Sequence, residues 1–324
     1  VFFELVLIPG AFLIGIWGDE QRGAASMKVF IYTLVGSLLM LVGILYMGIH
    51  AAGLKEGLSF TTDYFTVKEA MTSGTIAALG ETAQGWLLAA FAISFAIKAP
   101  LFPFHTWQPL AYSSSSVGGS VILAGVMSKM GAFGFVRYCL PLFPQALESS
   151  AFLLATLAVI GIIYGAYMAV VQTDLKRLIA YSSLSHMGFI ILGIFALNEE
   201  ALNGAILQMF AHGISTAAMF LLADMVEQRY GTRNIQELGG LASKAPLFTA
   251  FFMIATMASV GLPGLSGFIG EFIIMVGAFD SGVLPPALAV IAAIGVVLAA
   301  VYLLNMFRKT MFGGTPVGID KSFD

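Results

Sequence analysis

Four ionisable side chains, Glu4, Lys98, Lys129 and Glu271, lie within long apolar segments of the sequence. A charged group inside a bilayer costs about 3 kcal/mol or more, so each of these residues is a functional candidate by default. Burial disfavours the charged form of such a group, and a buried lysine or glutamate can therefore exchange protons near neutral pH. The chemistry that these residues predict is proton transfer. A lysine that snorkels to the surface is the alternative for Lys129, but about ten residues separate it from either end of its segment.

Two histidines, His186 and His212, also fall within apolar segments. Because an imidazole in water titrates near pH 6.5, they could relay protons between the lysines and the carboxylates. A structural, hydrogen-bonded histidine is the alternative for both, and it is the favoured interpretation of His105; His50, near a segment end, is expected at the membrane interface. No histidine has a partner at metal-ligand spacing, so a zinc site is not expected.

The composition indicates that membrane helices must position these groups. Of 324 residues, 59 % are hydrophobic and only 10 % are charged, against about 25 % charged in soluble proteins. The net charge of −3 lacks the basic excess that nucleic-acid binding would need. Cys139 is the only cysteine, so this chain alone cannot build a disulfide or an iron–sulfur cluster, and any redox cofactor must belong to a partner.

Long apolar stretches recur about nine times, and a spanning helix needs about 20 apolar residues. They cover roughly residues 1–17, 29–53, 85–112, 117–139, 151–172, 178–197, 201–226, 247–279 and 285–307. The sequence opens inside an apolar run without an initiator methionine, which predicts a truncated start. The fold class predicted is an all-α polytopic membrane protein.

Basic residues accumulate in cytoplasmic loops, so their distribution predicts the orientation. With nine crossings, one side of the membrane collects Arg22, Lys28, Lys176, Arg177, Arg229, Arg233, Lys244, Arg308, Lys309 and Lys321. The other side collects only Lys55, Lys68 and Arg137. The loop at residues 174–177 and the C-terminal end are therefore expected in the cytoplasm. Asp224, Glu227 and Arg229 are interpreted as a solvated helix end on that side.

Two of the apolar segments are interrupted in the middle. Pro100 and Pro103 follow Lys98 closely, and residues 261–270 place a proline and four glycines just before Glu271. Proline removes backbone hydrogen bonds, and irregular backbone at membrane depth survives only where protein or a water-filled cavity surrounds it. Paired interrupted helices beside ionisable groups are typical of transporters built from inverted repeats. Packing kinks without transport are the alternative.

Four motifs carry a family resemblance: residues 98–107, residues 119–125 with Lys129, residues 172–183 with His186, and residues 264–272. Together they resemble the antiporter-like membrane subunits of complex I, the proton-pumping NADH:quinone oxidoreductase. The resemblance implies an inverted-repeat helical bundle with two discontinuous transmembrane helices, of which this chain resembles helices five to thirteen of about fourteen. It further implies the end of a first repeat at 1–139, a second repeat at 140–312 and the start of a C-terminal connection at 313–324.

The resemblance also implies roles by position. Glu4 matches the glutamate that pairs with the lysine of the first broken helix, here Lys98, and Lys129 matches the lysine at the centre of the hydrophilic axis. His186 and His212 match relay positions beyond it, and Glu271 matches the terminal ionisable residue of the second broken helix. Other types in the family usually carry lysine there, so glutamate favours the chain M, or chain 4, type.

The function implied is proton translocation, driven by redox chemistry in partner subunits that hold FMN, iron–sulfur clusters, NADH and quinone. Other antiporter-like subunits and the lipid bilayer are the expected partners, and the bacterial inner membrane is the expected location. A cation/proton antiporter module, or a subunit of a related membrane hydrogenase or photosynthetic complex, is the nearest alternative. A structural subunit that does not transport is the second. A stand-alone enzyme is disfavoured, because the sequence contains no nucleotide loop or nucleophile constellation.

One stretch departs from the family pattern. Residues 110–117 read Leu-Ala-Tyr-Ser-Ser-Ser-Ser-Val, where the family usually has an acidic residue, a histidine and a proline. Any role in proton entry that belongs to those residues is therefore not carried over to this chain.

Overall fold

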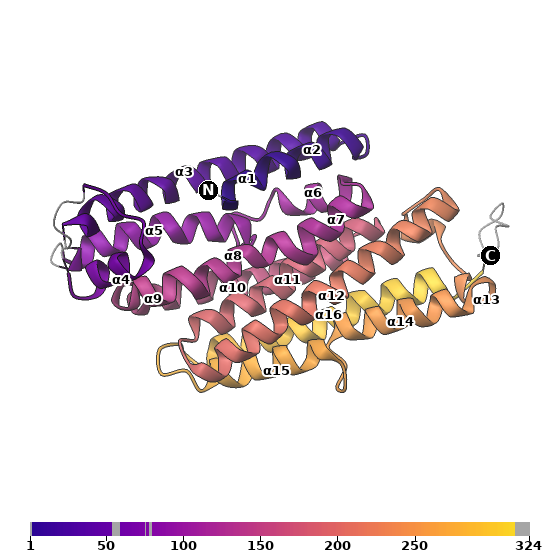
Figure 1. Cartoon of the computed structure of the whole chain (residues 1–324). Helices are drawn as coiled ribbons and strands as arrows, with labels where there is room; N and C mark the ends of the chain where they lie inside the picture. Colours follow the sequence, from indigo (N-terminus) through magenta and orange to yellow (C-terminus); the bar gives the residue numbers. More distant parts are fainter. Residues whose placement is uncertain (1, 54–58, 75, 78–79, 315–324) are drawn as a thin grey trace.

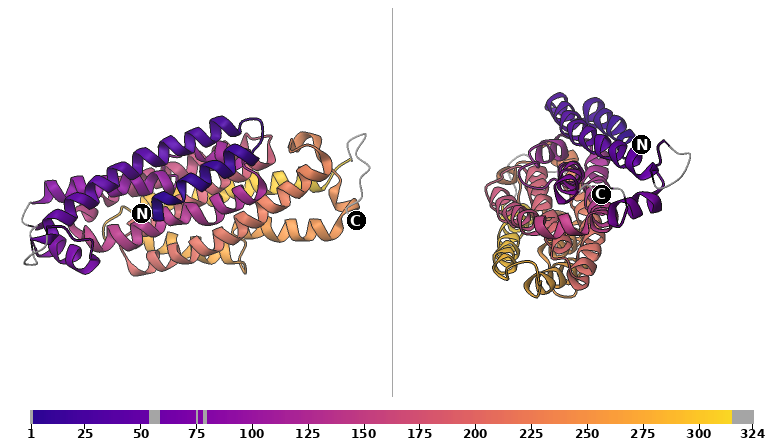
Figure 2. Two further views of the ribbon diagram at one scale, coloured as in Figure 1. Left: turned by 45° about the horizontal axis from the view of Figure 1, so that its top comes forward. Right: turned by 90° about the vertical axis from the view of Figure 1, so that its left-hand side faces the viewer.

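The computed structural model describes residues 2–53, 59–74, 76–77 and 80–314. Helices make up its regular structure, and these described residues form no strand beyond an isolated bridge between Asp174 and Asn234. The helices lie side by side in an elongated bundle (Figures 1 and 2). The predicted all-α fold is confirmed.

The helices follow one another in nine groups that correspond to the nine predicted segments. In chain order they are α1 (Phe2–Leu5) with α2 (Leu7–Trp17); α3 (Arg22–Ala52); α5 (Glu81–Lys98) with α6 (Gln108–Ser114); α7 (Val117–Ile122) through η2 (Leu123–Met127), α8 (Ser128–Gly134) and η3 (Phe135–Cys139) to α9 (Leu140–Leu142); α10 (Pro144–Val170); α11 (Leu175–Phe195); α12 (Glu199–Tyr230); α14 (Pro246–Val260) with α15 (Ser266–Phe279); and α16 (Ala287–Met311). Three short helices, α4 (Tyr64–Thr72), η4 (Ile235–Glu237) and α13 (Leu241–Lys244), lie in the connections.

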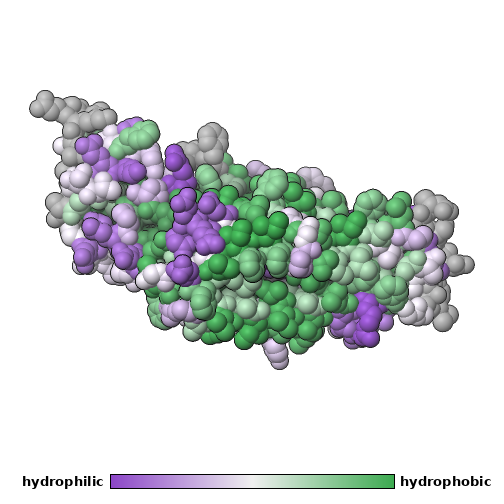
Figure 3. Space-filling model, turned by 90° about the horizontal axis from the view of Figure 1, so that it is seen from below, coloured by the Kyte–Doolittle hydropathy of each residue, from purple (hydrophilic) through white to green (hydrophobic). Residues whose placement is uncertain are grey.

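The outer surface of the bundle is suited to lipid. Six continuous helices are long and apolar enough to cross a membrane on their own, and the other three groups consist of shorter or interrupted helices. Large apolar side chains point outward along them, among them Phe12 on α2, Val42 on α3 and Phe210 on α12. Figure 3 shows the result on one face, where hydrophobic residues occupy the middle and hydrophilic residues gather toward the ends. The chain is a multi-pass membrane protein.

The first interruption separates α5 from α6, as predicted. Proline has no backbone N–H, so carbonyl groups at the end of α5 lose their helical partners. The indole of Trp107 compensates by donating to the carbonyl oxygen of Ile97 at 2.9 Å. The backbone N–H of Leu101 donates to the carbonyl oxygen of Ala96 at 2.7 Å. These contacts stabilise a bend in the apolar layer directly after Lys98.

The second interruption separates α14 from α15. Helix α14 ends at Val260. The next residue, Gly261, has a φ of 80°, which lies in the left-handed region that glycine adopts without steric cost. The backbone N–H of Leu262 then donates to the carbonyl oxygen of Met257 at 3.1 Å. Helix α15 begins at Ser266, one turn and a half before Glu271. Both interruptions therefore lie next to an ionisable side chain.

Glycine lets the helices that carry the candidate site approach closely. A Cβ atom on Gly131 of α8 would lie 2.5 Å from the backbone nitrogen of Ala99 at the end of α5. A Cβ atom on Gly213 of α12 would lie 3.0 Å from the carbonyl oxygen of Gly125 in η2. Small residues at such crossings allow backbone contact in the membrane. The central helix of residues 117–142 is thus clamped between α5 and α12.

Candidate functional site

The carboxylate of Glu271 forms one end of the candidate site. Glu271 is 3 % exposed, and its Oε1 atom accepts hydrogen bonds from Nδ1 of His186 at 2.6 Å and from the amide of Gln208 at 2.8 Å. Its other oxygen lies against the backbone of the second interruption, where a Cβ atom on Gly261 would be only 3.3 Å away. The interruption therefore provides the space in which a carboxylate fits at membrane depth.

Two histidines continue the site from Glu271 into the bundle. His186 on α11 and His212 on α12 are both buried, and their ring centroids lie 5.5 Å apart. Among the described residues, Nε2 of His186 and both ring nitrogens of His212 have no hydrogen-bond partner. Buried polar atoms usually have hydrogen-bond partners, so unpaired nitrogens on two adjacent imidazoles make this place a candidate functional site.

Lys129 lies next to His212, at the end of an unusual stretch of helix. The π-helical segment η2 precedes it, and its ammonium group donates to the carbonyl oxygen of Ala124, five residues earlier. The contact between Gly125 and Gly213 brings the two helices together, and a Cβ atom on Gly213 would lie 4.0 Å from Cε of Lys129. Lys129 and His212 are close enough to interact electrostatically. π-Helical turns often occur at functional sites.

Lys98 forms a second centre, at the end of α5. It is 4 % exposed, and its Nζ atom donates to the carbonyl oxygen of Phe3 at 3.0 Å and lies 4.2 Å from the centre of the Phe3 ring. Glu4 is half-buried and near enough to interact electrostatically with Lys98, while its own Oε1 atom has no partner among the described residues. The structure thus brings Glu4 and Lys98 together without a direct contact between the two charged groups.

Helix packing joins the two centres, and no chain of hydrogen bonds between described residues connects them. Gly131, two residues after Lys129, packs on Ala99, the residue after Lys98. His105 lies in the first interruption, where its ring stacks on Phe102 and contacts Tyr164 at centroid distances of 5.4 and 4.9 Å. The structure therefore assembles Lys129, His212, His186 and Glu271 on adjacent helices, and the close approach of Gly131 to Ala99 joins the helix of Lys129 to the helix of Lys98.

Sequence reasoning missed two contributors to this site. Gln208 holds Glu271, and it precedes His212 by four residues on the same apolar helix, so its position in a membrane segment was the available indication. The hydroxyl groups of Ser182 on α11 and Tyr302 on α16 lie 2.9 Å apart in the buried interior. A tyrosine in an apolar segment gives no comparable indication, because most such side chains serve packing.

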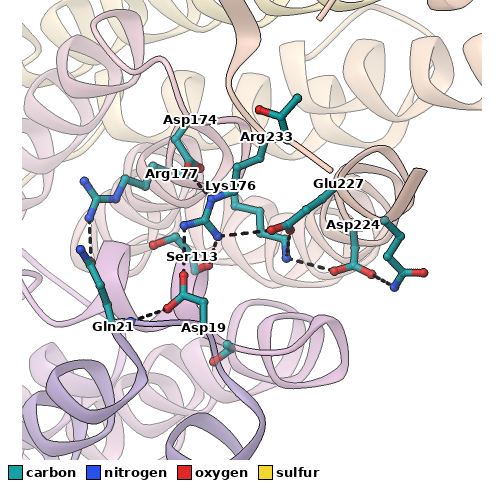
Figure 4. A network of polar contacts seen from close by, with 12 residues as sticks. Asp19, Gln21, Ser113, Asp174, Lys176, Arg177, Asp224, Glu227 and Arg233 are labelled. Carbon is teal, nitrogen blue, oxygen red and sulfur yellow. Dashed lines mark hydrogen bonds and ion pairs between the residues drawn. The ribbon is translucent and has the colours of Figure 1, made fainter. Parts of the chain in front are cut away.

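A network of charges lies at one end of the bundle, which we call the network end (Figure 4). Arg233 contacts the carboxylates of Asp19 at 3.0 Å and Glu227 at 3.8 Å, forms an ion pair with Asp174, and donates to the carbonyl oxygen of Ser113 at 3.0 Å. The loop of residues 113–116, which departs from the family pattern, is therefore held by this network. Asp19 also donates its backbone N–H to the carbonyl oxygen of Ser114 at 2.9 Å.

The interpretation of Asp224 as part of a solvated helix end is wrong. Asp224 is 9 % exposed, and Lys176, which is 4 % exposed, contacts it at 3.0 Å and Glu227 at 2.6 Å. The amide of Gln228 also donates to Asp224. Lys176 at the start of α11 and Asp224 near the end of α12 are 48 positions apart, and the sequence does not show that these two consecutive helices bring them together. Glu227 and Arg229 are half-buried rather than fully solvated.

The chemistry available to the site is proton exchange. Lysine, histidine and glutamate each accept and release a proton, and the four residues from Lys129 to Glu271 lie on adjacent helices. Within the described ranges, no group of three or more histidine, cysteine, aspartate or glutamate side chains could hold a metal ion. The fold and the site together define a polytopic membrane protein with two discontinuous helices around a buried line of ionisable groups.

Comparison with known proteins agrees with this class. Residues 1–300 match the family model described as NADH:quinone oxidoreductase/Mrp antiporter, TM. The chain is 41 % identical over 315 residues to NADH-quinone oxidoreductase subunit M of Rickettsia prowazekii and 40 % identical over 314 residues to NADH-ubiquinone oxidoreductase chain 4 of Marchantia polymorpha. Each alignment covers 97 % of this chain and 60 % of the relative. The chain belongs to the NADH:quinone oxidoreductase/Mrp antiporter membrane family.

Solved structures agree with the sequence comparisons. A chain of respiratory complex I from Thermus thermophilus superimposes with a TM-score of 0.88 at 36 % identity, covering all of this chain and 66 % of that one. A chain of the Mrp complex from Dietzia sp. shares the fold, with a TM-score of 0.81 at 24 % identity over 97 % of this chain and 56 % of that one. The chain thus spans about 60 % of the length of the curated relatives named above.

Proposed function

We propose that this chain is part of a proton-translocating membrane subunit of an NADH:quinone oxidoreductase. The observation that carries the proposal is the line formed by half-buried Lys129 and by buried His212, His186 and Glu271, of which His186 and Glu271 are joined at 2.6 Å. Ionisable groups are costly in a membrane, so their presence there indicates a function. A relative that is 41 % identical, in an alignment that covers 97 % of this chain, is named as a subunit of NADH-quinone oxidoreductase, which supports the choice of complex.

In this proposal the proton moves along the line in one order. Separation of Glu4 from Lys98 lets Lys98 release a proton, which passes to Lys129, then through His212 and His186 to Glu271. The contact of Lys98 with the carbonyl oxygen of Phe3, rather than with a carboxylate, supports a lysine that can give up its charge. The assignment of these six residues rests on their burial and neighbours together with the family resemblance.

The partners and cofactors follow from the same proposal. Redox chemistry would take place in partner subunits that carry FMN, iron–sulfur clusters, NADH and quinone, and neighbouring antiporter-like subunits would flank this chain in the bilayer. The network end, with most of the basic residues, would face the cytoplasm of a bacterial inner membrane, and the C-terminal end would lie on that side. Residues 1–139 and 140–312 would form the two inverted repeats, followed by a connection at 313–324.

The Lys98→Ala variant tests this function in the full-length protein within its complex. We expect proton pumping driven by NADH oxidation to fall by about tenfold, because a buried relay loses its proton-carrying group. Lys98→Arg should also impair pumping, since arginine scarcely releases its proton. Lys68→Ala, which changes an exposed lysine on α4, is the matched control. Undiminished pumping by Lys98→Ala would refute the proposed role.

A structural subunit is the second candidate function, and the network end is the observation that favours it. Its charges form paired contacts, as expected of a scaffold that joins helices. In that case Lys98→Ala would lower the amount of assembled complex and leave the pumping per electron unchanged. Co-purification with antiporter or hydrogenase subunits, together with sodium-dependent transport, would instead favour the related transport complexes.

A further inference from the structure

A small cavity lies beside His186, and the other side chains that line it do not belong to the proposed proton line. The cavity volume that the centre of a water molecule can reach is about 10 Å³. Its lining includes the side chains of Ser182 and His186 on α11, Thr216 on α12 and Ser259 on α14. His186, Ser182 and Thr216 are each more than nine-tenths buried. A cavity of this size holds about one water molecule if two to four polar groups face it.

The hydrogen bonds of His186 show which ring nitrogen needs a partner. The ionised carboxylate of Glu271 can only accept hydrogen bonds, so with Glu271 charged Nδ1 of His186 is the donor in the 2.6 Å contact with Oε1. In the neutral ring, Nε2 is then a lone-pair acceptor. Nε2 is buried and has no partner within the part of the chain that the structure describes. The cavity lies against this residue.

We propose that this cavity binds one ordered water molecule, which donates a hydrogen bond to Nε2 of His186 and is held by the hydroxyl groups of Ser182 and Thr216. The hydroxyl group of Ser182 lies 2.9 Å from that of Tyr302, so it can accept from one neighbour and donate to the other. Ser259, half-buried near the second interruption, lines the same cavity. The carboxylate of Glu271 fixes the imidazole tautomer in which Nδ1 donates, and the water then satisfies the lone pair of Nε2.

The water also gives His186 a second proton partner. A proton that arrives on the water as hydronium is taken up by Nε2, and the water is left neutral. The ring is then an imidazolium; Nδ1 gives its proton to the carboxylate of Glu271, so the ring returns to its neutral form with the proton on Nε2 and Glu271 becomes a neutral acid. The reverse transfers return the proton to the water. This inference rests on the proposed function, because it makes Glu271 a proton acceptor.

The first measurement is a map of the intact complex, by electron cryomicroscopy at a resolution that shows ordered water. We expect density within hydrogen-bonding distance of Nε2 of His186 and of at least one of the two hydroxyl groups. The same density should be lost in the Ser182→Ala/Thr216→Val variant, which keeps the shape of the cavity and removes its polar lining. A wild-type map with ordered water elsewhere in the interior and none at this position would overturn the proposal.

The second measurement is proton flux per electron in the same variants. We expect Ser182→Ala/Thr216→Val to lower it by about fivefold, because a positioned proton partner is lost. Ser185→Ala is the matched control, since Ser185 is equally buried on α11 but donates to the carbonyl oxygen of Ile162 on α10. Ser259→Ala, at the half-buried wall, provides a milder variant that should give a smaller loss if the double variant does not assemble. Unchanged flux in an assembled Ser182→Ala/Thr216→Val complex, or in the Ser259→Ala complex if the double variant does not assemble, would overturn the inference.

The two proposals fail in different ways. If Lys98→Ala abolishes pumping while Ser182→Ala/Thr216→Val pumps normally, the water site is wrong and the proton line stands. If Lys98→Ala pumps normally, the proposed function is wrong, whereas the density in the cavity still decides whether the water is bound.

Discussion

The proton line and the network end differ in how completely their polar and charged groups are paired. Several polar atoms in the line have no hydrogen-bond partner among the described residues, namely Nε2 of His186 and both ring nitrogens of His212. The same holds for Oε1 of Glu4, which lies near Lys98. At the network end, Arg233 contacts three carboxylates and a carbonyl oxygen, and Lys176 contacts two carboxylates. Both regions hold charged residues inside or beside the same helices.

The difference distinguishes the role in proton transfer that we propose for the line from the helix-packing role of the network end. A paired buried charge is expensive to separate, so a saturated network resists rearrangement. A group with few partners changes its protonation state at lower cost, because few contacts must be rebuilt. The line is therefore suited to proton transfer. The network end joins the α2–α3 connection, the end of α6, the start of α11 and the end of α12.

Replacing Lys129 is expected to have the largest effect. Lys129→Ala removes the central carrier of the line, and we expect proton flux per electron to fall by at least about tenfold. The complex should still assemble, because the hydrogen bond that this side chain makes among the described residues is to its own helix, at the carbonyl oxygen of Ala124. The measurement is proton uptake by vesicles that contain the reconstituted complex, with NADH oxidation recorded in parallel.

Lys309→Ala provides the control for this change, because Lys309 is an exposed lysine near the end of α16. A Lys129→Ala complex that assembles and pumps at the wild-type ratio would contradict the comparison. A complex that fails to assemble would instead show that Lys129, like the network end, holds helices together.

Much of the proton line could be predicted from the sequence, for a physical reason. Lysine, glutamate and histidine are costly in apolar segments, so the sequence alone makes Lys98, Lys129, His186, His212 and Glu271 candidate site residues. The two interruptions were predicted for a similar reason, since Pro100 and the glycines near residue 264 conflict with a continuous helix.

The pairings could not be predicted in the same way. His186 and Glu271 are 85 positions apart, and Arg233 and Asp19 are 214 apart, so only the packing of the helices brings them together. Burial of Asp224 depends on Lys176 in another helix, and near a membrane surface a lone aspartate looks solvated. Gln208 was missed because an amide carries no charge, although its hydrogen bond to Glu271 is among the strongest constraints on the site.

Replacing Arg233 should affect assembly more than transport. Arg233→Ala leaves Asp19, Asp174 and Glu227 without their common partner, which we expect to cost about 2 kcal/mol of folding stability. The expected result is less assembled complex with a lower apparent Tm and an unchanged ratio of protons to electrons in the part that assembles. Arg22→Ala, at an exposed arginine at the start of α3, is the control. A normal yield with a lower ratio would show that the network takes part in transport.

Replacing Gln208 tests how strongly the line depends on a neutral partner. Gln208→Leu removes one of the two hydrogen bonds to Oε1 of Glu271, and we expect proton flux to fall by about threefold, less than for Lys129→Ala. Assembly should be retained, because leucine occupies similar space. Asn198→Leu gives a useful contrast, since its amide serves the start of α12 and the carbonyl oxygen of Gly277 rather than the line. Comparable loss of flux in both variants would mean that the effect comes from packing.

The smallest effect is expected at Glu237, an exposed residue in the segment that follows Arg233. The hydroxyl group of Thr232 donates to it at 2.6 Å and the amide of Asn234 at 2.8 Å, and these hydrogen bonds hold the pKa of Glu237 below its usual range. A lowered pKa in the folded state stabilises the fold above the unfolded value, near pH 4.3, and that contribution disappears as the pH falls through the folded value.

We therefore expect Glu237→Gln to lower the apparent Tm of the purified complex slightly, by about 1 °C at pH 7, and to match the wild type once the pH is well below about 4. Thermal unfolding at a fixed scan rate across this pH range measures the difference. Proton flux should not change, because Glu237 contacts Thr232 and Asn234 at the network end and no residue of the line. A change in flux without a change in Tm would show that the two regions are coupled.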